Sequence, residues 1–270
     1  MTQQRHIVFR RPGNRHGPIT RVISPGDVAK LTKPFVFLDY VNAPRGQAPG
    51  FGFHPHSGIA TLTHPLSFDV QHETSDGQVD VVHSGGVEWV AAGKGVWHKA
   101  QVVRSDARVL GFQLWFSLPP SAELGEPTTQ FVEPRDVPES GPVRVLLGRY
   151  QSAVSPVMAP LDANYFWVRL SAGERWTYTP PPNHQTAWVF VQSGKVTVND
   201  QSVGEELAVF ESGNDHLEFE AVSDCSFLLG SAAPYEHDLV LGNYSVHTSP
   251  QALAVGERRI QEIGAELASR

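Results

Sequence analysis

The histidine pair in the segment GFGFHPHSG is the first feature of this sequence that could do chemistry. In an extended segment residues i and i+2 point to the same side, so His54 and His56 can direct both imidazoles at one point, with Pro55 stiffening the chain between them. A third imidazole, from His98 in the segment AAGKGVWHKA, could complete the set. Three such nitrogens suit a divalent metal ion. The alternative is that the pair lies on a polar loop and that His98 is an ordinary exposed residue.

Two neighbouring residues are not first-choice ligands for such an ion. His64 lies eight residues beyond His56, which is roughly 26 Å if one strand carries both. Glu88 stands five residues before Gly93, and we interpret it as an exposed strand residue rather than a ligand. The aromatic residues around the histidines would be mostly core, with the wall of a pocket for a flat ligand as the alternative: Phe51, Phe53, Trp89, Trp97 and Trp115.

Composition limits the class of protein. The chain has 270 residues, with 21 Lys and Arg against 28 Asp and Glu, a net charge of −7 that argues against direct nucleic-acid binding. With 40% hydrophobic and 18% charged residues the chain is too apolar for disorder, and no apolar run nears the ~20 residues that span a membrane. Cys225 is the only cysteine, so any metal must be held by histidine and carboxylate. The N-terminus lacks the apolar stretch of a secretory signal, and we expect a cytoplasmic protein.

Short β-strands must position the histidines. The 24 Gly and 21 Pro are spread through the chain and separate short segments rich in Val, Phe, Trp and Thr, which is typical of many strands joined by turns. Only residues 250–268 are predicted to be helical. A series of short strands with one terminal helix favours an all-β sandwich or barrel. The predicted strands cover residues 35–40, 59–64, 68–72, 78–82, 87–91, 109–116, 143–147, 165–170, 186–192, 195–198, 206–210, 216–221 and 226–231.

A proline-rich stretch divides this series of strands. Residues 118–141 contain five prolines and break the strand pattern, so they form the natural boundary between two domains. Both halves have an extended segment, a histidine before a strand and a hairpin turn that carries glycine. A duplicated barrel is the simplest account. We therefore predict an N-terminal barrel with the metal site over residues 1–125 and a C-terminal barrel with the terminal helix over residues 126–270.

Several motifs of the chain resemble those of the pirin family. These are HPHSG at 54–58 with TLT at 61–63, AGKGVWH at 92–98, PFVFLDY at 34–40, and EHDLV at 236–240 followed by GNYSV at 242–246. The resemblance extends over nearly the whole chain, with the motifs in the same order. It implies a bicupin, two cupin-type antiparallel β-barrels with a short C-terminal helix. It also implies a metal, often iron, held in the N-terminal barrel by three histidines and one glutamate.

The carboxylates that the family resemblance leads one to expect are missing. Carried over by position, the three histidines are His54, His56 and His98, but the glutamate position two residues later is Ala100. The second acid of the cupin pattern falls at Ala60. Three neutral imidazoles leave the ion its full charge and more open positions, so we expect weaker metal binding. Iron is the first candidate, with nickel, zinc, manganese and copper as alternatives.

The resemblance to the pirin family, taken with these residues, leaves three functions open. The first is a metal-dependent dioxygenase that cleaves quercetin or another flavonol-like aromatic, although Ala100 cannot serve as the base that the family's glutamate would supply. The second is a non-catalytic metal-binding protein that acts as a regulatory partner of another protein. The third is a barrel that has kept its structure and lost its chemistry. We expect a monomer, and a metal-free second barrel in which His184 has only His216 as a conceivable partner.

Overall fold

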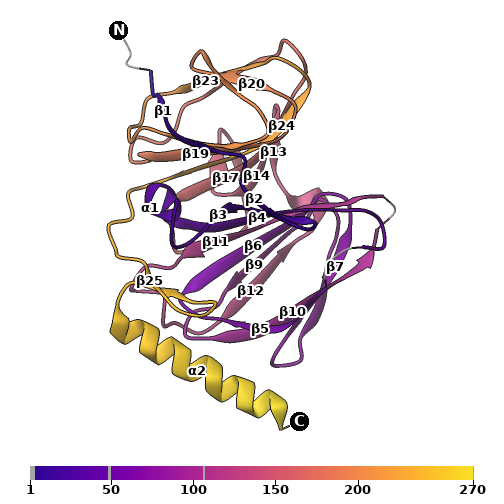
Figure 1. The fold of residues 1–270 in the computed structure, drawn as a ribbon, viewed down its shortest axis with the longest axis vertical. Helices are drawn as coiled ribbons and strands as arrows, with labels where there is room; N and C mark the ends of the chain where they lie inside the picture. The colour runs from indigo at the N-terminus through magenta and orange to yellow at the C-terminus, as the bar shows by residue number, and fades with distance from the viewer. Residues whose placement is uncertain (1–3, 48–49, 106, 270) are drawn as a thin grey trace. The chain divides into compact units, whose positions relative to one another are not determined.

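The computed structural model describes residues 4–47, 50–105 and 107–269. Contacts within the chain group them into two compact units (Figure 1). The N-terminal unit comprises residues 15–30, 35–136 and 236–270, and the C-terminal unit comprises residues up to 14, 31–34 and 137–235. The two ends of the chain are thus exchanged, because the first strand belongs to the C-terminal unit and the last helix to the N-terminal unit. The division into domains at residue 125 stays a prediction.

The N-terminal unit consists of two antiparallel sheets. The larger has seven strands, in the order β12 (Thr128–Val132), β9 (Val87–Ala91), β6 (Ile59–Pro65), β11 (Val109–Ser117), β4 (Phe35–Ala43), β3 (Ile19–Ile23) and β2 (Asn14–His16). The smaller has four, in the order β5 (Phe51–His56), β10 (Val96–Arg104), β7 (Asp69–Thr74) and β8 (Val79–Val82). Strands of both sheets line one cavity, so the sheets face each other across it.

Burial alternates along the strands that matter most for the site. In β7 the inward residues are Val70, His72 and Thr74, and in β10 Val96 and His98 are buried while their neighbours are less so. This period of two follows from the pleat of a strand that faces the core on one side. It places His72 and His98 inside the unit on neighbouring strands.

The C-terminal unit repeats the two-sheet arrangement. Its larger sheet has the order β1 (Ile7–Arg11), β22 (Leu207–Phe210), β19 (Thr186–Ser193), β24 (Cys225–Ala232), β17 (Ala163–Leu170), β14 (Val143–Leu147) and β13 (Glu139–Ser140). The smaller has the order β18 (Arg175–Tyr178), β23 (Leu217–Ala221), β20 (Val196–Val198) and β21 (Gln201–Val203), and a separate hairpin joins β15 (Arg149–Tyr150) to β16 (Ala153–Val154). Aromatic and aliphatic side chains fill its interior, Trp176, Phe219 and Phe227 among them.

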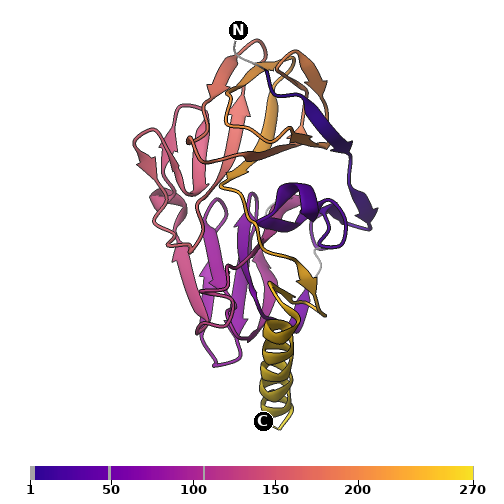
Figure 2. The same cartoon turned by 90° about the vertical axis from the view of Figure 1, so that its left-hand side faces the viewer.

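Helix α2 (Pro250–Ala268) ends the chain and follows the hairpin of β25 (Val240–Leu241) and β26 (Val246–His247), as Figure 2 shows. Ser249 caps it, since its hydroxyl accepts a hydrogen bond from the backbone N–H of Ala252 at 3.1 Å, and Pro250 begins the first turn. Ala252, Gly256, Ile260 and Ile263 form its buried stripe. The indole of Trp97 on β10 donates to the carbonyl of Ile260 at 2.7 Å, which ties the helix to the four-stranded sheet.

The predicted all-β class and the predicted helix over 250–268 are confirmed. Among the described residues, hydrogen bonds do not close the sheets into barrels, so each of the two expected barrels is open and consists of separate sheets. A four-residue helix, α1 (Ala29–Thr32), was not predicted, nor was the 3₁₀ turn η1 (Pro134–Asp136). A single turn carries no helical periodicity from which it could be found.

Candidate metal centre

The three predicted histidines converge in the N-terminal unit. Their ligand atoms all lie within 4.8 Å of one another, and the ring centroids of His54 and His98 are 4.4 Å apart. His54 and His56 come from β5 and His98 from the adjacent β10, where His98 is the register partner of His54. The i, i+2 spacing on one strand and the pairing of two strands together produce the cluster, which we call the triad.

Hydrogen bonds at Nδ1 fix which nitrogen of two of these rings is free. Nδ1 of His54 lies 2.8 Å from the carbonyl of Gly52, and Nδ1 of His56 lies 3.1 Å from the carbonyl of Tyr244. A carbonyl only accepts, so in both rings Nδ1 carries the proton and donates it. Nε2 of each ring is left with its lone pair for a metal.

The buried nitrogens of the triad fit a metal ion. Within the described residues, Nε2 of His56 and Nε2 of His98 are buried and have no hydrogen-bond partner. Leaving such atoms unsatisfied costs about 1–3 kcal/mol each, and native structures rarely do so without an ion or water. Three neutral imidazoles are a common ligand set for divalent transition metals.

Burial keeps the triad neutral. Desolvation, helped by the charge of His54, lowers the pKa of His56 to about 3, against a smaller opposing effect of the Tyr244 carbonyl. Burial also lowers the pKa of His54, and it lowers the pKa of His98 well below its usual range. The lone pairs are therefore available to a metal throughout the neutral and mildly acidic range.

The low pKa of His56 predicts acid sensitivity of the metal-free protein. His56 takes up a proton near pH 6.5 in the unfolded chain but only near pH 3 in the folded chain. The stability that neutral His56 contributes above pH 6.5 is therefore lost as the pH falls toward 3. From this residue alone we expect a loss of roughly 3 kcal/mol between pH 7 and 4.5. Urea unfolding at both pH values measures it. His56→Gln should unfold with a pH dependence that is shallower by this amount, and an equal dependence in both proteins would contradict the prediction.

The two positions without carboxylates both lie inside the unit. Ala60 on β6 is fully buried, and Ala100 on β10 lines the same cavity as His98. This cavity has a volume of about 60 Å³, and most of the side chains that line it are apolar. Ala100 is the register partner of His72 on β7. The side chain at position 100 therefore faces the inside of the unit beside the triad.

Glu88 is not the exposed strand residue that the sequence suggested. It is only 3% exposed, because β9 lies inside the seven-stranded sheet between β12 and β6. Its Oε1 lies 3.1 Å from Nδ1 of His72, and Nε2 of His72 lies 2.7 Å from Nδ1 of His98. Burial raises the pKa of Glu88, opposed by His72 and by a hydrogen bond from Thr63. Sequence analysis did not single out His72, although the alternation in β7 could have placed it inside.

His64 lies outside the triad, although not for the reason that the sequence offered. The chain turns at Ser57 and Gly58, so β5 and β6 are separate strands and the distance along one strand does not apply. His64 is buried, and its Nδ1 lies 2.7 Å from the carbonyl of Gly86.

The aromatic residues near the triad divide into two groups. Trp89 is fully buried. Trp115 stacks on Phe37 with ring centroids 4.0 Å apart and makes a T-shaped contact with His56, with ring centroids 4.8 Å apart. Phe51 and Phe53 are more than one third exposed, so these two lie outside the core that we expected to hold most of the five.

A buried polar network ties the C-terminal segment to the triad's strand. Glu123 accepts from His247 Nδ1 at 2.9 Å and from the Thr248 backbone at 2.8 Å. Nε2 of His247 lies 3.0 Å from the hydroxyl of Ser57, and this hydroxyl lies 2.9 Å from that of Ser245. This network fixes the segment whose Tyr244 carbonyl orients His56. Sequence analysis missed it, because its members come from distant parts of the chain.

Gly256 of α2 leaves the space that this network needs. A Cβ at this position would stand 2.5 Å from both Nε2 of His247 and the Ser57 hydroxyl. Gly256→Ala is therefore expected to destabilise the protein by about 1–2 kcal/mol, although alanine in a helix normally gains up to about 1 kcal/mol. Urea unfolding checks this, with the exposed Ala254→Gly measuring the propensity term of the same helix. A stabilised Gly256→Ala would contradict the network's packing.

The histidines of the C-terminal unit make other contacts. His184 is buried, with Nδ1 2.9 Å from the hydroxyl of Ser231 and Nε2 2.9 Å from Asp162. Nε2 of His216 lies 3.0 Å from Glu218. Both ring nitrogens of His184 therefore already have partners. Neither is free to bind a metal together with His216, the partner that the sequence offered.

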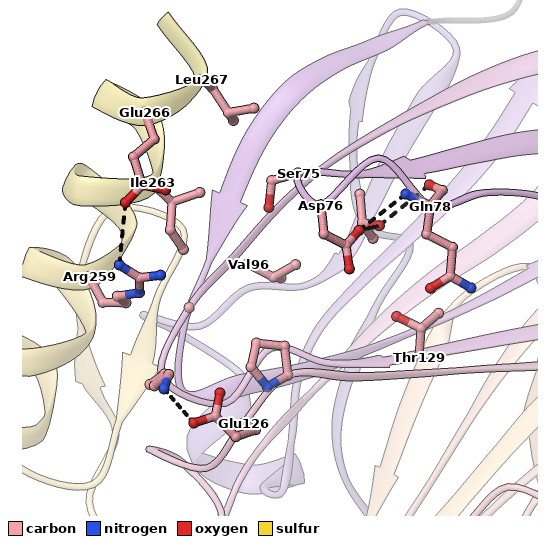
Figure 3. A pocket seen from close by; sticks show the side chains of 14 residues that line it. Ser75, Asp76, Gln78, Val96, Glu126, Thr129, Arg259, Ile263, Glu266 and Leu267 are labelled. Carbon is pink, nitrogen blue, oxygen red and sulfur yellow. Dashed lines mark hydrogen bonds and ion pairs between the residues drawn. The ribbon is translucent and has the colours of Figure 1, made fainter. Parts of the chain in front are cut away.

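A larger pocket of about 370 Å³ opens between α2 and the turns of the four-stranded sheet (Figure 3). Its charged groups pair with neighbours, since Lys94 contacts Glu126 at 2.5 Å and Arg259 contacts Glu262 at 3.1 Å. Asp76 accepts from Thr74 and from the backbone of Gln78. These pairs leave the pocket without a convergent set of reactive groups, in contrast to the triad.

Comparisons with known proteins match both parts of the chain. The family model described as Pirin matches residues 18–116, and the model described as Quercetinase C-terminal cupin domain matches residues 156–229. A pirin-like protein of Caulobacter vibrioides is 30% identical over 225 residues, which cover 80% of this chain and 81% of that protein.

No helix in the described part of the chain is both long enough and apolar enough to cross a membrane.

Two solved structures share the fold. A quercetin 2,3-dioxygenase from Acinetobacter baumannii superposes with a TM-score of 0.88 at 24% identity, covering 97% of this chain and 99% of that one. A bacterial pirin from Escherichia coli, solved in complex with nickel(II), gives a TM-score of 0.67 at 20% identity, covering 84% and 99%. The predicted cupin class is thereby confirmed.

Proposed function

Because this chain belongs to the pirin family, we propose that its triad binds a divalent metal ion and that the loaded protein is a dioxygenase of flavonol-like aromatics such as quercetin. The observation that carries the proposal is the pair of buried, unpartnered Nε2 atoms of His56 and His98 beside His54. The match of residues 156–229 to a quercetinase cupin domain supports the substrate class.

The metal's protein ligands are His54, His56 and His98. A bound ion, iron first and nickel, zinc, manganese or copper as alternatives, would supply Lewis acidity toward a substrate hydroxyl and, if redox-active, electron exchange with dioxygen. The chain itself contributes three neutral imidazole nitrogens. The carbonyls of Gly52 and Tyr244 set the orientation of two of these rings, those of His54 and His56. Three protein ligands leave coordination positions open, which is what a catalytic rather than a structural site requires.

The substrate would bind at the mouth of the site. The cavity of about 60 Å³ beside His98 is far too small for a three-ring flavonol. Phe51, Phe53 and Tyr244 are all more than one third exposed, and the rings of Phe51 and Tyr244 lie 6.5 and 6.1 Å from that of His54. Such rings suit stacking against a flat aromatic ligand.

The alternative function is a non-catalytic metal protein or a regulatory partner of another protein. Ala60 and Ala100 favour it, because neither can take a proton from a substrate hydroxyl. Under the catalytic proposal the substrate must therefore reach the site already ionised or lose its proton to another acceptor. A pH profile of turnover that rises with ionisation of the flavonol would support this route.

Metal analysis followed by oxygen uptake separates the two functions. Protein purified without chelator is analysed for metal, loaded separately with Fe(II) and Ni(II), and mixed with quercetin in an oxygen electrode. Stoichiometric metal with oxygen uptake supports the dioxygenase. Stoichiometric metal without uptake supports the binding protein, and failure to bind either ion would overturn both.

A further inference from the structure

We propose that Glu88 is a positioning residue for the metal ligand His98 and acts on it through His72. This proposal rests on the proposed metal site and assigns a carboxylate to it. Glu88, His72 and His98 come from β9, β7 and β10, so two sheets contribute to one line of contacts. The line supplies from a distance the negative charge that Ala60 and Ala100 do not supply directly.

The contacts are continuous and shielded from water. Oε1 of Glu88 lies 3.1 Å from Nδ1 of His72, whose Nε2 lies 2.7 Å from Nδ1 of His98. The three residues are no more than 3% exposed. At the far end lies Nε2 of His98, which is buried and has no hydrogen-bond partner among the described residues; Oε1 of Glu88 also has none, so its contact with His72 is electrostatic. In both His72 and His98, Nδ1 thus faces back along the line toward Glu88, and Nε2 faces forward toward the triad's ligand atoms.

The direction of the protons along this line decides whether His98 can bind a metal. For Nε2 of His98 to offer a lone pair, its proton must be on Nδ1 and be donated to Nε2 of His72. His72 must then carry its own proton on Nδ1, facing Glu88. A negative carboxylate 3.1 Å from that nitrogen attracts the proton electrostatically and favours the required order, as carboxylates behind histidine ligands do in other metal sites.

The other two ligands do not need such a line. His54 and His56 each donate to a backbone carbonyl, which holds the same tautomer without any charged group. His98 alone has a second imidazole at its Nδ1, and an imidazole can either donate or accept there. Glu88 removes this ambiguity. A buried carboxylate is costly unless partnered, so its position against His72 is unlike that of a residue kept for core packing.

A cycle of variants tests the proposal. Glu88→Gln keeps the shape and removes the charge, His72→Phe keeps a ring and removes both nitrogens, and the double variant combines them. His64→Phe is the control, since it replaces another buried imidazole of the same unit that bonds a carbonyl. Ni(II) affinity is measured by competition with a chelator, and the absorption spectrum of the Co(II)-loaded protein reports ligand geometry. Thermal unfolding of the metal-free proteins shows whether each variant folds.

We expect Glu88→Gln and His72→Phe each to weaken Ni(II) binding by ~10–100-fold and to alter the Co(II) spectrum. The double variant should bind no more weakly than His72→Phe, because Glu88 acts only through His72. His64→Phe should keep its affinity. If the wild type binds Ni(II) and both single variants bind it equally well, this inference is overturned while the proposed metal site stands. Additive losses of affinity in the double variant would have the same meaning. Absence of Ni(II), Co(II) and Fe(II) binding by the wild type would overturn both. If one single variant fails to fold, the other decides by its own affinity.

Discussion

Replacing His98 by alanine is expected to abolish stoichiometric metal binding. The change removes a ligand whose neighbours at 4.4 and 4.9 Å between ring centroids, His54 and His56, cannot close the gap that it leaves. Since loss of an outer contact already costs 10–100-fold, we expect loss of the ligand itself to cost at least ~100-fold in affinity. Metal analysis after gel filtration and a chelator competition measure the loss.

His64→Ala is the matched control for this change. It also removes a buried imidazole from the N-terminal unit, so it reproduces the packing defect without touching the triad. We expect it to lower stability and to keep the metal. Undiminished metal content in folded His98→Ala would show that the three nitrogens do not share one ion. The same result for His56→Ala would extend that conclusion to β5.

Restoring a carboxylate at position 100 is expected to produce the largest change in activity. Ala100→Glu places an acid on the same inward face of β10 as His98, in the cavity that both residues line. It should tighten metal binding, and a general base is typically worth ~100–10,000-fold in rate. Flavonol cleavage should therefore rise well above that of the wild type. Oxygen uptake with quercetin and metal affinity are measured on the same preparations.

The surroundings of position 100 define the control and the contradicting result. Ala100 packs beside Phe68, Val70 and Val109 and pairs with His72, so a larger side chain also fills space and meets a second imidazole. Ala100→Gln has the same size without the base, and it should give neither tighter binding nor faster cleavage. Equal turnover in the wild type and Ala100→Glu would show that the substrate proton leaves by another route. Tighter binding without a gain in turnover would indicate a different substrate or a non-catalytic role.

The parts of the structure that were predicted from the sequence are those set by local patterns. The core strands are rich in β-branched and aromatic residues, and β9, β14 and α2 have the predicted limits. The convergence of His54 and His56 follows from the period of a strand. The short polar strand β2 carries no comparable pattern, so it was not predicted. The glycine-containing β5 was treated as an extended segment at His54 and His56, but its limits as a strand were not predicted.

The parts that could not be predicted depend on which strands are neighbours. Whether Glu88 is buried is decided by β12 and β6 on either side of it, and its contact with His72 crosses from one sheet to the other. The carbonyl that orients His56 belongs to Tyr244, whose side chain has no part in that bond and whose position lies far along the chain. No spacing rule links such residues. The sequence shows directly that positions 60 and 100 lack a carboxylate, but it does not show that Glu88 contacts His72.

The exchange of the chain's ends sets the order in which a nascent chain can complete the metal centre. His54, His56 and His98 leave the ribosome early, whereas Tyr244, the buried network at Ser57 and helix α2 depend on residues that are made after the C-terminal unit. At 5–20 residues per second the interval is on the order of ten seconds, during which the C-terminal unit is also synthesised. Until then the imidazole of His56 lacks its orienting carbonyl, and the strands that α2 covers are open to solvent. The proposed metal site can thus be completed only after the C-terminal unit has been made, and a fragment that stops before residue 236 would carry all three ligands without the Tyr244 carbonyl that orients His56.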